Sequence, residues 1–105
     1  MAFIRPDEMR TREPRPGWHG RFFDSANMSF ADYTIEAGSW IHEHHHPNEE
    51  VWIVIEGELE VTVGGETRKA VPGCVAIVPP DVPHSVRALT SGRALVADHP
   101  LRQGF

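Results

Sequence analysis

Alternating histidines followed by a β-branched run constrain the fold of this chain more than any other feature. His42, His44 and His46 lie at positions i, i+2 and i+4. That spacing places all three rings on one face only if the backbone is extended, because strand side chains alternate between faces. A proline and an asparagine then interrupt the strand, and the run VWIVI at residues 51–55 predicts a second one. The stretch is therefore predicted to be β structure.

A carboxylate opens the second of these strands. Glu50 directly precedes the β-branched run. If the two strands form an antiparallel hairpin, the carboxylate comes back beside the imidazoles at the end of the first strand. Three nitrogens and one oxygen can then converge, and this donor set is suited to a divalent transition metal.

The remainder of the chain also reads as short strands between turn residues. Among 105 residues there are 9 Gly and 9 Pro, and no long amphipathic helical pattern is present. We expect a hairpin around residues 24–27, a second at Gly64 and Gly65, and a last one across residues 91–92. Residues 74–78 predict a buried strand, and the tail after residue 97 is expected to be peripheral. Nine or ten such strands predict an all-β fold, a sandwich or barrel of antiparallel strands.

The chain is long enough for one domain only. Residues 1–17 contain three prolines and many charges, so they predict an N-terminal arm that lies across the domain or a partner. Residues 18–105 are predicted to form the single barrel domain.

Composition excludes several classes of function. The net charge of -5 and the scattered arginines provide no basic surface, so we expect no nucleic-acid partner. No apolar run is long enough to span a membrane, and no secretory signal is visible, so a cytoplasmic location is expected. The single Cys74 cannot form an intrachain disulfide and is expected to be a packed thiol.

The spacing of the polar residues resembles that of the cupins, a family of small jelly-roll barrels. The first motif of the family is Gly, five residues, His-x-His, three or four residues, Glu, six residues, Gly. Its fixed positions are filled here by Gly38, His44, His46, Glu50 and Gly57.

The second cupin motif is Gly, five residues, Pro-x-Gly, two residues, His, three residues, Asn. Gly73, Pro79 and His84 match it, whereas Asp81 replaces the second Gly and Ala88 replaces the Asn. The resemblance covers residues 38–88 and implies a cupin jelly-roll barrel of antiparallel strands.

The resemblance implies that His44, His46, Glu50 and His84 bind one divalent transition metal ion per chain, namely Fe, Mn, Ni, Co, Cu or Zn. The chemistry of the residues agrees, because three neutral imidazoles and one carboxylate suit these ions. Four protein ligands on an octahedral ion leave two positions open, which is typical of a catalytic rather than a structural metal.

Strand alternation places three further side chains on the metal face. His42 shares the parity of His44, so we expect it to be a catalytic base or a proton-transfer residue. Trp40 precedes His42 by two residues and Trp52 follows Glu50 by two, so both are candidates for a substrate pocket. Core packing and a solvated ring are the competing interpretations.

These features predict a metal-binding cupin enzyme that acts on a small oxygen-bearing organic molecule. With Fe(II) the reaction is expected to be oxidative and dioxygenase-like. With Mn, Ni or Zn the same site serves an isomerase, cyclase or lyase as a Lewis acid. A ligand-binding or sensing module without catalysis is the alternative from another class.

Apolar residues with the opposite parity to Glu50 predict a partner surface. Val51, Ile53 and Ile55 alternate away from the expected metal site. An exposed apolar strip of this kind is typical of a homodimer interface.

Overall fold

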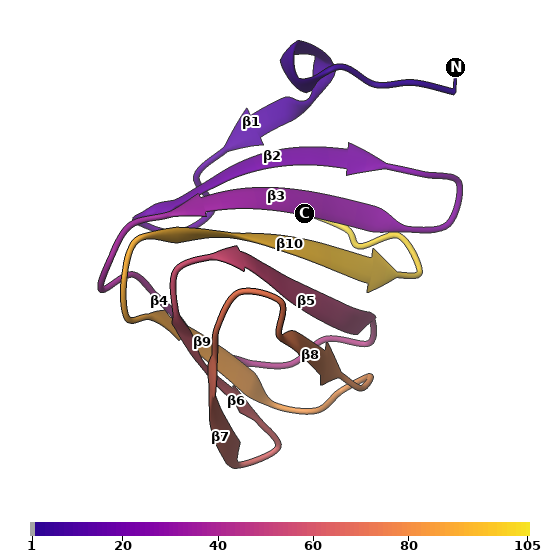
Figure 1. Cartoon of the computed structure of the whole chain (residues 1–105). Coiled ribbons are helices and arrows are strands. Elements are labelled where there is room, and N and C mark those ends of the chain that lie inside the picture. The colour runs from indigo at the N-terminus through magenta and orange to yellow at the C-terminus, as the bar shows by residue number, and fades with distance from the viewer. Residues whose placement is uncertain (1) are drawn as a thin grey trace.

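The computed structural model describes residues 2–105, and in this range the chain forms ten strands and one short 3-10 helix. Six strands make one antiparallel sheet, in the order β1-β2-β3-β10-β5-β8, and four make a second, β4-β9-β6-β7. The two sheets face each other (Figure 1). The prediction of an all-β antiparallel fold is confirmed. The elements are η1 (Pro6–Glu8), β1 (Arg10–Arg12), β2 (Trp18–Asp24), β3 (Ser29–Ile35), β4 (Trp40–His44), β5 (Glu49–Glu56), β6 (Leu59–Val63), β7 (Glu66–Ala70), β8 (Val75–Val78), β9 (His84–Ala88) and β10 (Gly92–His99).

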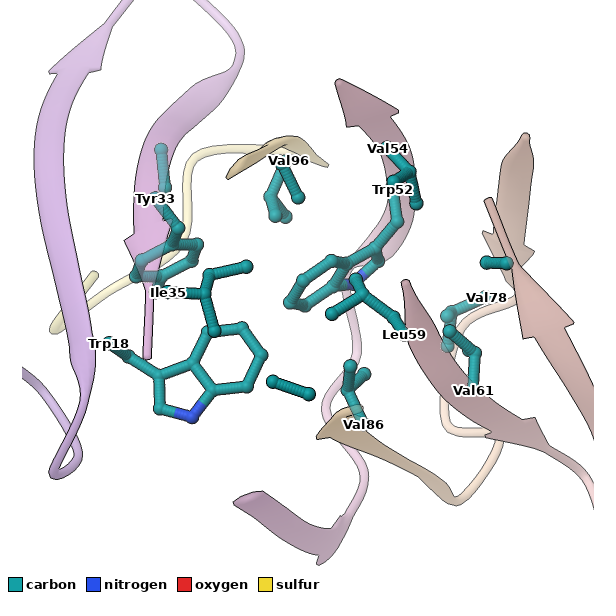
Figure 2. Close-up of a cluster of buried hydrophobic side chains, with 14 of the residues drawn as sticks. Trp18, Tyr33, Ile35, Trp52, Val54, Leu59, Val61, Val78, Val86 and Val96 are labelled. Carbon is teal, nitrogen blue, oxygen red and sulfur yellow. The ribbon is translucent and has the colours of Figure 1, made fainter. Parts of the chain in front are cut away.

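The core lies between the two sheets and is built from inward-facing aromatic and β-branched side chains. In β3 the residues Ala31, Tyr33 and Ile35 are buried while their neighbours are not, as the alternation of the sequence predicts. Trp18 packs edge-on against Tyr33 and Trp52, with ring centroids 5.6 and 5.8 Å apart. Figure 2 shows these aromatic rings among valine and leucine side chains from both sheets.

Two of the predicted hairpins exist and two do not. β2 pairs with β3, and β6 pairs with β7 around Gly64 and Gly65. The predicted hairpin across residues 91–92 is wrong, because β9 belongs to the four-stranded sheet and β10 to the six-stranded one. The predicted hairpin between the histidine strand β4 and β5 is wrong for the same reason. In both places a short connection carries the chain from one sheet to the other.

The connection between β5 and β6 also passes from one sheet to the other, and it requires a glycine. Gly57 adopts φ 79°, and a Cβ placed on it would lie 2.3 Å from the carbonyl oxygen of Ser91. A side chain at this position would be both strained and in collision with the backbone of the neighbouring connection.

β8 lies at the edge of the six-stranded sheet rather than in its interior. Val75 and Ile77 are 56% and 59% exposed, so the prediction of a buried strand over residues 74–78 is wrong. Only the opposite side of this segment faces inward: Val78 is buried, and Cys74 packs partly against the core. A short apolar run does not by itself distinguish a central strand from an edge strand.

Residues 10–12, in the segment predicted to be an arm, form β1 and pair antiparallel with β2. Figure 1 shows β1 at the margin of the six-stranded sheet. That the domain proper begins at Trp18 stays a prediction.

An ion pair on the outside of the six-stranded sheet links β3 to β10. Arg93 donates from Nε and Nη2 to the two carboxylate oxygens of Asp32, both at 2.9 Å. This guanidinium holds the pKa of the Asp32 carboxyl below its usual value of 3.8. Because the pKa is lowered in the folded state, the stabilisation is present above pH 3.8 and is lost as the pH falls through the lowered pKa.

Asp32→Asn is therefore expected to reduce the free energy of unfolding by about 1 kcal/mol at neutral pH, the value of a well-formed surface pair. Urea denaturation of both proteins measures the difference, which should shrink once the pH is below the usual aspartate value of 3.8. A difference that is the same in acid and at neutral pH would contradict this interpretation.

Candidate metal centre

Three histidines from separate segments meet between the sheets. His44 ends β4 and His84 begins β9, and the two are directly paired across the strands. His46 lies in the connection that follows β4. One ring nitrogen from each of these residues lies within 4.8 Å of those of the others. The prediction that these three histidines converge agrees with their placement.

Backbone carbonyl groups set the orientation of all three rings. A carbonyl oxygen can only accept, so the Nδ1 atom that faces it carries the hydrogen, and in the neutral ring Nε2 then keeps a lone pair. The three rings therefore present Nε2 as a potential metal ligand. The contacts are His44 Nδ1 with the His42 carbonyl at 2.9 Å, His46 Nδ1 with the Asn48 carbonyl at 3.1 Å, and His84 Nδ1 with the Val82 carbonyl at 2.9 Å.

Glu50 supplies a carboxylate from the opposite sheet. It lies on β5 and is 2% exposed. Its Oε1 is 3.3 Å from Nε2 of His46, and its Oε2 is 3.3 Å from Nε2 of His84. The indole of Trp52, two residues further on the same face, donates to Oε2 at 2.6 Å and fixes the carboxylate. Both sheets and one connection thus contribute to the cluster.

Two nitrogens in this cluster lack a partner that satisfies them. Nε2 of His46 and Nε2 of His84 are buried and form no hydrogen bond with acceptable geometry. The 3.3 Å separations from Glu50 exceed the 2.7–2.9 Å of a charge-assisted hydrogen bond. Buried lone pairs that face a carboxylate are unfavourable unless a cation lies between them. Three imidazole nitrogens and one carboxylate oxygen are compatible with a divalent transition metal ion.

Two of these groups have the charge state of a metal ligand. Burial lowers the pKa of His44, which keeps its ring neutral at neutral pH. Burial acts to raise the pKa of Glu50, but the polar groups around its carboxylate, led by His46 and His84, hold this pKa well below its usual range. Burial opposes a charge on His84 as well, yet the neighbouring carboxylate raises its pKa above the ordinary value. In the metal-free protein a proton therefore competes for this nitrogen.

Arg102 and Asp98 complete the surroundings of Glu50. Nη1 of Arg102 donates to Oε1 of Glu50 at 3.0 Å and to Oδ2 of Asp98 at 3.1 Å. Asp98 is 0% exposed, and burial raises the pKa of its carboxyl. The expectation of a peripheral tail is wrong, because the segment that follows β10 returns over the site. Sequence reasoning missed both residues, although Asp98 continues the buried alternation of Ala94 and Val96 and so placed a carboxyl on an apolar face.

A cavity of about 270 Å³ opens onto this cluster. His44, Glu50 and Trp52 line it together with core aromatic residues from β2 and β3. Trp52 therefore lies where a substrate pocket was expected, and its contact with a substrate stays a prediction.

Trp40 and His42 lie on the other face of their strand. Ile41 pairs with Val86 and His44 with His84, so β4 uses one more residue than β9 between these two pairs. This β-bulge reverses the alternation between Ile41 and His44. The inward orientation predicted for Trp40 and His42 is therefore wrong.

The environment of these two side chains is the outer surface of the four-stranded sheet. Trp40 is 45% exposed and its ring lies 4.1 Å from that of His42, while the guanidinium of Arg87 lies 5.2 Å above the Trp40 ring. Neither residue lines the cavity. The geometry offers no support for His42 as a catalytic base or for Trp40 as a pocket residue.

The loop before His84 accommodates Asp81, which replaces the second glycine of the second cupin motif. Asp81 adopts φ 63°, in the left-handed region that the glycine of the motif would favour and that aspartate tolerates. Its amide donates to the carbonyl of His46 at 2.8 Å. The loops that carry His46 and His84 are joined by this bond.

Fold and site together define a class of protein: a small antiparallel jelly roll with a histidine and carboxylate cluster inside one end. The family model described as "Cupin domain" matches residues 31–99. The chain belongs to this family.

Comparison with individual proteins agrees with the assignment. An uncharacterized protein of Streptomyces coelicolor is 32% identical over 102 residues, which are 95% of this chain and 97% of that protein. An RmlC-like cupin from Shewanella frigidimarina matches with a TM-score of 0.90 at 22% identity, over 98% of this chain and 94% of that one. KdgF from Halomonas sp. matches with a TM-score of 0.87 at 22% identity, over 96% of both chains.

A larger enzyme contains the same fold. Oxalate decarboxylase from Bacillus subtilis, described in a study of its Mn(II) centres, matches with a TM-score of 0.82 at 20% identity. The match covers 92% of this chain but 29% of that one. Within residues 2–105, no helix is long and apolar enough to cross a membrane.

Proposed function

We propose that His44, His46, Glu50 and His84 bind one divalent transition metal ion, and that the protein is a metal-dependent enzyme for a small oxygen-bearing organic molecule. The observation that carries this proposal is the pair of buried, unpartnered Nε2 atoms on His46 and His84, which face the Glu50 carboxylate. A metal ion would satisfy both nitrogens and balance the carboxylate.

Different groups of the chain would orient the ligands of this ion and bind the substrate. The backbone carbonyls hold the three rings with Nε2 inward, and Trp52 holds the carboxylate. A bound ion supplies a Lewis acid, or with Fe(II) a redox centre, for an oxygen donor of the substrate. The apolar part of the cavity wall orients the substrate and excludes water.

We place an oxidative, dioxygenase-like reaction first and a non-redox lyase, isomerase or cyclase second. One observation favours the non-redox alternative: oxalate decarboxylase, an enzyme with Mn(II) centres, has the same fold. A ligand-binding or sensing module is the outcome if no turnover accompanies metal binding.

Metal analysis of purified, folded protein tests the proposal. We expect about one equivalent of Fe, Mn, Ni, Co, Cu or Zn per chain after reconstitution. Oxygen consumption with small phenols and diketones then separates the two reaction classes, since the dioxygenase-like reaction consumes O2 and the Lewis-acid reactions do not. Protein that takes up none of these ions would overturn the proposal.

We also propose a homodimer that forms through the outer face of the six-stranded sheet. Side chains paired across five neighbouring strands form an apolar row on this face, and a second, shorter row lies beside it. The first consists of Phe23, Phe30, Ala97, Val51 and Ile77, and the second of Leu95, Ile53 and Val75. Contiguous apolar surface of this kind on a small domain is typical of an interface, and a two-fold axis through the row would pair it with itself.

Light scattering at micromolar concentration is expected to give the mass of a dimer, and Ile53→Glu is expected to give a monomer, because it places a carboxylate in the centre of the apolar face. Glu60→Lys, on the outer face of the other sheet, is the matched control and should leave the mass unchanged. A monomeric wild-type protein would contradict the proposal.

A further inference from the structure

The cavity beside the metal centre carries many hydrogen-bond donors and few acceptors. Three arginines line it, Arg12, Arg15 and Arg102. Glu50 is the only acidic residue of the lining, and it already accepts from Trp52 and Arg102. This cluster of positive charge is exceptional in a chain of net charge -5. The cavity therefore favours an anionic, acceptor-rich ligand.

Two neutral donors belong to residues of the same wall. Trp18 is 0% exposed and lines the cavity, and among the described residues its Nε1 has no hydrogen-bond partner. This nitrogen is itself buried, so a ligand oxygen would reach it only after a movement of the wall. Burial raises the pKa of Tyr33, a second lining residue, to about 12, so its phenol keeps its proton.

Two prolines restrict the backbone on either side of Arg15, an exposed residue of the cavity lining. Pro14 and Pro16 flank it and fix their own φ angles. The amide of Trp18 donates to the Arg15 carbonyl at 3.0 Å and closes the turn. Within residues 2–105 no hydrogen bond or ion pair engages the Arg15 guanidinium, whereas Arg12 donates to the Gly104 carbonyl at 2.8 Å. Arg15 is therefore the arginine with its full donor set available.

The rest of the lining is apolar. Ile41, Val86 and Val96 contribute aliphatic surface, and Phe22 and Phe105 pack edge-on with ring centroids 5.2 Å apart. A ligand made only of charged groups would leave this surface against water. A carboxylate attached to an apolar or aromatic body fits both parts of the wall.

We propose that the cavity binds small organic carboxylates with an apolar body, whose carboxylate is received by Arg15 with Arg12, while a neighbouring oxygen faces the metal centre. This inference rests on the proposed metal-dependent function and names its substrate class. Arg15 is the residue that distinguishes a carboxylate from its neutral analogue.

Titration of the zinc-loaded full-length chain with mandelate and with mandelamide tests this. Both probes carry a hydroxyl beside a carbonyl and a phenyl body, but only mandelate is an anion. Fluorescence of Trp18 and Trp52, which line the cavity, reports binding. We expect mandelate to bind about tenfold more tightly, the effect of one charge-assisted hydrogen bond.

Arg15→Gln is expected to weaken mandelate binding about tenfold and to change mandelamide binding less than about twofold. A tenfold loss already cancels the tenfold preference of the wild type, so neither this variant nor the Arg12→Gln/Arg15→Gln double variant should prefer mandelate. Arg68→Gln is the matched control: it removes the same charge from a side chain that is 79% exposed and paired with Glu66 on β7, and it should bind like the wild type. Zinc content, measured in every variant, should not change.

Equal affinity for the two probes, no binding of mandelate, or a preference that survives in the double variant would overturn the inference. Failure of the metal proposal is distinguishable from these outcomes. In that case the wild type takes up no zinc, and the same titration of the metal-free chain still decides whether the arginines prefer the acid.

Discussion

Substitution of His84 by alanine is expected to weaken Zn(II) binding more than about 100-fold. Loss of a group that only supports a metal ligand typically lowers metal affinity 10- to 100-fold, and this substitution removes a candidate ligand itself. His84 is 1% exposed and its Nε2 lies 3.3 Å from Oε2 of Glu50, so its imidazole is held inside the cluster. Competition with a chromogenic zinc chelator measures the affinity. Circular dichroism shows whether the variant is folded.

His45→Ala is the matched control for this experiment. His45 lies between two of the candidate ligands in the sequence, but its side chain is 65% exposed and lies 3.9 Å from Asp81. We expect the affinity of this variant to equal that of the wild type. If His84→Ala retains wild-type affinity while it is folded, the ligand set is wrong. His84→Gln, which fills the space without an imidazole, repeats the test if the alanine variant does not fold.

Replacement of Arg102 by methionine is expected to lower the free energy of unfolding of the metal-free protein by about 3 kcal/mol. A single nitrogen of Arg102 bonds both Glu50 and Asp98, and these carboxyls are 2% and 0% exposed. Without the guanidinium, two buried carboxyl groups remain beside each other and lose the cation that bridges them. Breaking a buried pair by removing one partner is costly because the other charge stays buried.

A bound metal should reduce this loss, because a cation beside Glu50 takes over part of the role of Arg102. Urea denaturation in the presence of EDTA and of zinc measures both values. Arg68→Met provides the control, since surface pairs contribute between about 0 and 1 kcal/mol and that of Arg68 is exposed. A loss of equal size with EDTA and with zinc would show that Arg102 does not substitute for a cation at this site.

His44, His46, Glu50 and His84 are found together, as the resemblance to the cupin motifs implied. The hairpin by which the spacing alone was expected to bring Glu50 beside the histidines does not exist, because β4 and β5 belong to different sheets. The alternation of β3 and the outward parity of Ile53 follow from the two-residue periodicity of strands. The features that the sequence did not predict depend on which strands are neighbours in a sheet.

The errors share one physical cause. At two points in this chain consecutive strands belong to different sheets, so β4 does not pair with β5 and β9 does not pair with β10. The orientation of His42 depends on the pairing of β4 with β9, a strand some forty residues later. Arg102 reaches Glu50 from a tail with no periodic pattern. None of these relations is encoded within a local window of sequence.

The β-bulge in β4 means that strand length, and not residue type alone, selects which histidines face the interior. Deleting Glu43 would restore uninterrupted alternation against β9 and exchange inner for outer positions over half of the strand. The deletion of one residue would thus change which face several side chains occupy. The number of residues in β4, as well as their types, therefore determines which histidines lie inside the barrel.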